Sequence, residues 1–106
     1  MSVTVLSHPA CNRHNVGSDH PENPARLHAI SDQILSSGLE FVIHQRDAKA
    51  AHVDQIALAH DRAYIQSVIN KSPQEGEVWL DDDTAIMNKS LEAAFYAAGA
   101  GIMAVD

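Results

Sequence analysis

The sequence has little that would tie it to a membrane, to nucleic acid or to an oxidising compartment. Its single cysteine, Cys11, cannot form an intramolecular disulfide. No apolar run approaches the roughly 20 residues that span a bilayer, and the first residues carry no basic leader. Seven Lys and Arg against 14 Asp and Glu give a net charge of -7, with no basic cluster for phosphates. We therefore expect a cytoplasmic protein that binds neither nucleic acid nor membrane.

What is present indicates one globular domain. A chain of 106 residues with 45% hydrophobic content is in the range of a single domain, and no repeat or linker interrupts residues 1–106. Apolar, β-branched runs at residues 3–6 and 41–43 predict two short strands, the first of them buried. A helical pattern lies between them. This alternation indicates an α/β arrangement, a parallel sheet flanked by helices.

The intervening helix has clear start and stop signals. Asn23 is in position to cap it, Pro24 suits its first turn, and Gly38 ends it. Its apolar residues recur at the spacing of one helix face, at Leu27, Ile30, Ile34 and Leu35. The sequence therefore predicts an amphipathic helix over residues 24–37.

The second half predicts further helices around a short extended segment. One or two helical turns are expected over 53–58, an Asp61-capped helix follows, and residues 78–80 are extended. The expected buried face of the Asp61 helix consists of Tyr64, Ile65, Val68 and Ile69. A long helix then begins near Leu91, where Gly99 and Gly101 indicate close approach of a neighbouring backbone. Its apolar period is still running at Asp106, which predicts a longer natural chain.

Two local patterns invite a metal interpretation. The loop over residues 7–23 carries four side chains that tetrahedral zinc accepts, although histidines of polar loops more often bond backbone groups; they are His8, Cys11, His14 and His20. Asp81 and Asp83 begin an EF-hand-like count, but Ile86 stands where that loop requires glycine. The acidic stretch is therefore interpreted as a solvated turn.

Three separated segments, in order, resemble the histone deacetylase superfamily, most of all its class II and bacterial deacetylase-like branch with the acetylpolyamine amidohydrolases. They are HPENPARL at residues 20–27, LAHDRAYI at 58–65, and DDDT at 81–84 with the alanine- and glycine-rich helix at 91–100. Together they extend over most of the chain. The resemblance implies the amino-terminal part of an arginase-deacetylase fold.

The resemblance also implies a chemistry. Members of this family hydrolyse an acylated amine, such as acetyl-lysine in a protein or an acetylpolyamine, with one zinc ion that activates water. The family's metal ligands and proton-handling pair lie in His-His and Asp-x-His motifs, and this sequence contains neither. We therefore expect zinc in the full-length enzyme, and expect the 106-residue chain alone to bind none and to be inactive.

Several residues acquire roles from the resemblance alone. Arg26 matches an arginine below the active-site tube, where a cavity is thought to release acetate and a fixed cation suits the carboxylate. Asp83, or alternatively Asp81, matches a rim aspartate that accepts hydrogen bonds from substrate backbone amides. The first loop, which shapes the tube mouth in this family, contributes His14, His20, Pro21 and Glu22.

Two other interpretations remain open. The chain could be a small acidic module that binds metal through the His8, Cys11, His14 and His20 loop. It could also be a short, non-catalytic homologue that oligomerises through an exposed sheet edge. A fragment with two or three parallel strands leaves apolar surface and an unpaired edge exposed, so self-association is expected.

Overall fold

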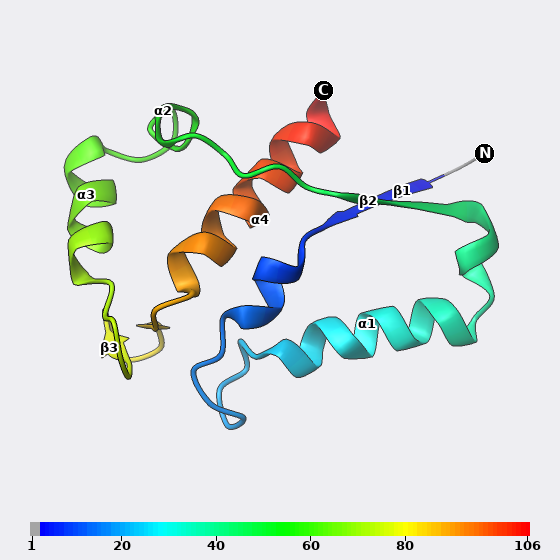
Figure 1. Cartoon of the computed structure of the whole chain (residues 1–106), viewed down its shortest axis with the longest axis horizontal. Helices are drawn as coiled ribbons and strands as arrows, with labels where there is room; N and C mark the ends of the chain where they lie inside the picture. Colours follow the sequence, from blue (N-terminus) through cyan, green and yellow to red (C-terminus); the bar gives the residue numbers. More distant parts are fainter. Residues whose placement is uncertain (1–2) are drawn as a thin grey trace.

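The computed structural model describes residues 3–106 (Figure 1). Strands β1 (Val3–Ser7) and β2 (Ile43–Asp47) form a parallel pair in which Val3 lies opposite Ile43 and Ser7 opposite Asp47. Between them come the 3-10 helix η1 (Pro9–Arg13), the helix α1 (Pro24–Ser36) and the 3-10 helix η2 (Leu39–Val42). Parallel pairing around a helical crossover is the arrangement that the sequence predicts.

The second strand begins later than predicted. Phe41 and Val42 belong to η2, not to a strand, because Gly38 turns the chain with a left-handed φ of 80°. The amide of Phe41 then donates to the Gly38 carbonyl at 3.4 Å and closes a tight turn. Extended backbone starts only at Ile43.

Helix α1 begins and ends at its predicted signals. The Asn23 side chain accepts a hydrogen bond from the Ala25 amide at 2.9 Å, Pro24 opens the helix, and Gly38 follows its last turn. Its apolar face, however, is only partly covered by the described chain, since Leu27 and Ile34 are half-buried. Ile30 is 48% exposed and Leu35 is 60% exposed, and no residue of α1 is buried.

The second half contains three helices and a small hairpin. They are α2 (Val53–Ile56), α3 (Arg62–Lys71), β3 (Val78–Trp79), β4 (Ala85–Ile86) and α4 (Ser90–Val105), with β3 and β4 paired antiparallel. Asp61 precedes α3 as predicted, but its side chain makes no capping hydrogen bond. On the predicted buried face of α3, Ile65 is buried whereas Tyr64 is mostly exposed. None of the helices within residues 3–106 has the length and hydropathy that a membrane crossing requires.

Helix α4 organises the packing. It contacts η1 and β1, and in Figure 1 it lies between α3 on one side and α1 on the other. The core around it is made largely of small side chains, which are Ala10, Ala48, Ala51, Ala85 and Ala93 together with Val16, Ile65 and Ile86. Small residues let backbones approach closely, but each buries little apolar area.

Gly99 marks the closest of these approaches. The segment after β2 crosses α4, where the Ala51 amide donates to the Phe95 carbonyl at 2.9 Å. A Cβ atom at Gly99 would lie 1.6 Å from the Lys49 carbonyl oxygen, so no side chain fits there. The predicted backbone approach is confirmed at Gly99 and is wrong at Gly101, which is exposed with no atom within 4 Å of its would-be Cβ.

Strand β1 is less buried than predicted. Val3 is 53% exposed, and Val5 and Leu6 are half-buried, because the sheet that contains β1 has only two strands within residues 3–106 and the main helix packed against β1 is α4. The radius of gyration is 15.3 Å, whereas a compact domain of this size has about 13 Å. The chain is therefore more open than a complete globular domain of equal length.

Candidate functional site

The first loop and the acidic hairpin meet at a cavity of about 490 Å³. Its walls combine apolar and acidic side chains, contributed by Val16, Asp19, His20, Pro21, Trp79, Asp82 and Asp83. Residues more than 60 positions apart are thus brought together. Among the predicted site residues, the cavity joins His20, Pro21 and Asp83.

The acidic turn is the tip of the β3–β4 hairpin. The Leu80 amide donates to the Thr84 carbonyl at 2.7 Å and closes the turn. Within it, the Asp81 carboxylate accepts the Asp83 amide at 2.8 Å, and this bond, assisted by the Thr84 side chain, holds the pKa of Asp81 below its usual value. Asp81 therefore serves the turn itself, whereas Asp83 lines the cavity.

His20 connects the two walls. Its Nδ1 atom accepts the Glu22 amide at 3.0 Å, while its Nε2 atom lies 2.7 Å from the carbonyl oxygen of Asp83. The Asn23 side chain also donates to the His20 carbonyl at 2.7 Å, which ties the loop to the start of α1. Glu22 therefore contributes its backbone amide to this arrangement.

Trp79 is a cavity residue that the sequence-based argument did not single out. It lies on β3, is 53% exposed, and its ring centre is 6.0 Å from that of His20. The available signal was that the only tryptophan of the chain directly precedes the acidic turn. A half-exposed indole beside a cavity is a common feature of binding surfaces.

His14 lies away from the cavity. Its Nδ1 atom is 2.6 Å from the hydroxyl of Ser90, which is buried at the start of α4 and also accepts the Met87 amide at 2.9 Å. His14 therefore fastens the first loop to α4. It does not share a site with His20.

Arg26 is also separate from the cavity. It is exposed in the first turns of α1, and within residues 3–106 no ion pair or hydrogen bond joins its side chain to another residue. The described residues consequently do not enclose Arg26, and its predicted position below an active-site tube stays a prediction.

The four potential ligands of the first loop point to four different partners. The His8 ring stacks on Tyr96 with 3.6 Å between ring centres, and the Cys11 sulfur lies 3.8 Å from the Ala93 carbonyl oxygen. His14 and His20 bind Ser90 and Asp83. Within residues 3–106 no three His, Cys, Asp or Glu side chains gather as a metal site. The structure therefore does not bring these four side chains together.

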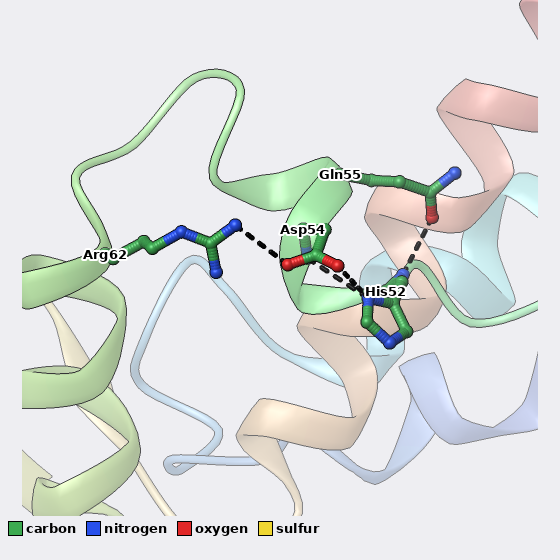
Figure 2. A network of polar contacts seen from close by, with 4 residues as sticks. All are labelled: His52, Asp54, Gln55 and Arg62. Atoms are coloured by element: carbon green, nitrogen blue, oxygen red, sulfur yellow. Dashed lines mark hydrogen bonds and ion pairs between the residues drawn. The ribbon is translucent and has the colours of Figure 1, made fainter.

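A second polar network joins α2 to α3 (Figure 2). His52 caps α2 by accepting the Asp54 amide at 3.2 Å, and Gln55 accepts the His52 amide at 2.8 Å. Arg62 donates to the Asp54 carboxylate at 2.8 Å, and this bond and charge, assisted by His52, hold the pKa of Asp54 below its usual value. The network lies on the surface and orients α3, not the cavity.

The fold and the cavity define an α/β protein whose candidate site is built from loops. A family model described as histone deacetylase domain matches residues 20–106. The chain therefore belongs to the histone deacetylase domain family, as the three sequence segments predict.

Individual relatives agree with this assignment. The chain is 30% identical over 93 residues to an uncharacterised protein of Methanocaldococcus jannaschii, covering 88% of the chain and 26% of that relative. It is 30% identical over 98 residues to the chloroplastic histone deacetylase 10 of Oryza sativa subsp. japonica, covering 82% of the chain and 22% of the relative. It thus spans about a quarter of the length of these relatives.

A solved structure supports the fold. The crystal structure of the HDA15 HD domain matches with a TM-score of 0.79 and 24% identity, covering 94% of this chain and 30% of that one. The predicted α/β class with a parallel sheet, as part of a deacetylase fold, is confirmed.

Proposed function

We propose that this chain forms a substrate-facing wall of an enzyme that hydrolyses acylated amines, either acetyl-lysine in proteins or acetylpolyamines. The observation that carries the proposal is the cavity between the first loop and the acidic hairpin. Its apolar residues, Val16, Pro21 and Trp79, suit the aliphatic part of such a substrate. The neighbouring carboxylates and the net charge of -7 favour a substrate with a positively charged amine over an anionic substrate.

Asp83 is the proposed rim aspartate. Asp83 is one of the residues that line the cavity, and its carboxylate can accept a hydrogen bond from a substrate amide, whereas the Asp81 carboxylate accepts the Asp83 amide. A hydrogen bond to a charged acceptor is worth about 1.5–3 kcal/mol. Loss of the Asp83 charge should therefore weaken substrate binding by roughly tenfold or more.

Arg26 is proposed as a second contact of the same reaction. An exposed guanidinium with no ion-pair partner in the described structure is able to bind a departing carboxylate. This role requires other parts of the enzyme to cover α1. The zinc ligands, too, would come from outside the described residues. The cytoplasmic location stays a prediction.

The test uses a chimera in which residues 20–106 replace the matching segment of the rice histone deacetylase 10. Hydrolysis of acetyl-lysine peptide and acetylpolyamine substrates would be followed. We expect Asp83→Asn to raise KM about tenfold and Asp81→Asn, the matched control, to change it little. Arg26→Ala should lower kcat strongly while lowering the free energy of unfolding little. Unchanged KM in the Asp83 variant, or unchanged kcat in the Arg26 variant, removes that residue from the proposal.

The 106-residue chain by itself should be inactive. Its described side chains do not gather into a metal site, and general acid-base groups alone contribute only about 10² to 10⁴-fold. Incubation with Zn²⁺ and a fluorogenic acetyl-lysine substrate should give background hydrolysis. Zinc-dependent turnover that a hydroxamate abolishes would contradict the proposal that the catalytic groups lie elsewhere.

A further inference from the structure

The two ring nitrogens of His20 face partners whose hydrogen-bonding roles are fixed. A backbone amide can only donate, so the Nδ1 atom that accepts the Glu22 amide at 3.0 Å carries no proton. In the neutral ring the proton is then on Nε2, which lies 2.7 Å from the Asp83 carbonyl oxygen, an atom that can only accept. Both bonds are satisfied by one tautomer, the neutral ring protonated at Nε2.

We propose that His20, as this neutral tautomer, is a positioning residue that ties the first loop to the acidic hairpin and sets the shape of the cavity mouth. We further propose that protonation of His20 releases the first-loop half of the link. The inference goes beyond the proposed function, because it depends only on contacts within the described chain and holds whichever reaction takes place at the cavity.

Protonation matters because it reverses the role of one nitrogen. An imidazolium carries N–H groups at both positions, so an Nδ1–H donor would face the Glu22 amide donor and the bond would be lost. The charged groups around His20 are the carboxylates of Asp19, Asp82 and Asp83 in the cavity wall and that of the adjacent Glu22. They attract the imidazolium toward the cavity.

Two other histidines provide an internal comparison. His8 and His52 also accept a backbone amide two residues ahead through Nδ1, at 3.0 Å from Ala10 and 3.2 Å from Asp54. Within residues 3–106, the Nε2 atom of neither ring makes a hydrogen bond to a distant segment. Only His20 joins the local cap to a second loop, which makes His52 a matched control.

The tautomer can be measured on the 106-residue chain directly. Nitrogen-15 long-range correlation spectra, recorded on the neutral ring, distinguish a proton on Nε2 from one on Nδ1. We expect His20 in the Nε2–H form. A predominant Nδ1–H form, or an equal mixture of the two, would overturn the proposal.

Trp79 reports on the link during acidification. It is the only tryptophan, its ring centre is 6.0 Å from that of His20, and a protonated imidazole quenches indole fluorescence. Fluorescence should fall through one step in the wild-type chain and in His52→Asn. The step should be absent in His20→Asn and His20→Gln, whose side-chain amides carry no ionisable group. A step that persists in both His20 variants would overturn the proposal.

The two His20 variants also separate the two halves of the link. Asparagine can still accept the Glu22 amide but is too short to reach the Asp83 carbonyl, whereas the longer glutamine amide can donate to that carbonyl. Acrylamide should therefore quench Trp79 more strongly in His20→Asn than in the wild type at pH 8, and His20→Gln should restore part of the protection. Equal quenching in wild type and His20→Asn would show that His20 does not hold the mouth.

Discussion

The face built on α4 and the face built on α1 differ in how far the chain covers its own apolar surface. On α4, Ser90, Ala93 and Gly99 are buried beneath η1 and the segment that follows β2. On α1 no residue is buried, and Ile30 and Leu35 stay about half exposed. Both helices have apolar stripes, so the difference lies in what packs against them.

The candidate site lies on the side of the molecule that is packed against α4. The cavity is bordered by the first loop and the β3–β4 hairpin, and the first loop is fastened to α4 through the His14–Ser90 contact. The α1 face presents instead an open apolar groove of about 400 Å³, lined by Ala29, Ile30, Gln33, Ile34, Ser37 and Leu39. The loops at the cavity are therefore held by contacts within the chain, whereas the apolar groove of α1 is open.

The strongest way to break the well-packed face is Gly99→Ala. Its Cβ would meet the Lys49 carbonyl oxygen, a backbone atom, so α4 or the crossing segment must shift. We expect a loss of about 3 kcal/mol in the free energy of unfolding, measured with urea. The matched variant Gly101→Ala meets nothing within 4 Å and should gain about 1 kcal/mol from helix propensity. Similar values for both variants would contradict the close crossing.

Ser90→Ala tests the fastening between the first loop and α4. It removes the hydroxyl that bonds His14 and accepts the Met87 amide. Both groups are part-buried and would lose this hydrogen-bond partner. The expected cost is about 1–3 kcal/mol in the same urea assay. Ser67→Ala removes an exposed hydroxyl that bonds the Tyr64 carbonyl at 2.7 Å, and should change stability by less than about 0.5 kcal/mol.

The open face is tested by Leu35→Glu. We propose that the chain self-associates through the α1 face, because exposed apolar patches favour association. Since Leu35 is 60% exposed, the substitution should cost little stability but shift the sedimentation profile toward monomer. Leu58→Glu, at an 89% exposed position outside α1, should leave association unchanged. A wild-type chain that sediments as a monomer at all accessible concentrations would refute the proposal.

The smallest expected effect is at the surface network of Figure 2, which supports neither face. Arg62 lowers the pKa of Asp54 in the folded chain. The pair therefore stabilises the fold at pH values above the usual Asp pKa of 3.8, and this stabilisation is lost as the pH falls through the lower pKa of the folded state. Asp54→Asn should weaken the acid dependence of stability in that window. Arg62→Gln should do the same, and the double variant should add nothing further. Additive effects would mean that the two residues act separately.

Features that depend on neighbouring residues could be predicted from the sequence. The Asn23 cap, the glycine stop at Gly38 and the long α4 period follow from hydrogen bonds and side-chain spacing within a few positions. The interior glycines of α4 indicated a close backbone approach, which is confirmed at Gly99, but the same rule was wrong at Gly101 and so did not tell which glycine makes the contact. Family membership followed from three short segments whose order was already in the sequence.

Which side chains lie together depends on packing between distant segments and could not be predicted from the sequence. In the folded chain Trp79 lies beside His20, His14 lies away from the cavity, and Arg26 is exposed. The Asp81 carboxylate bonds within the turn, whereas Asp83 lines the cavity. Strand β2 begins at Ile43, later than the sequence predicts. These outcomes depend on contacts between residues far apart in the chain, whose energies local propensity and spacing do not contain.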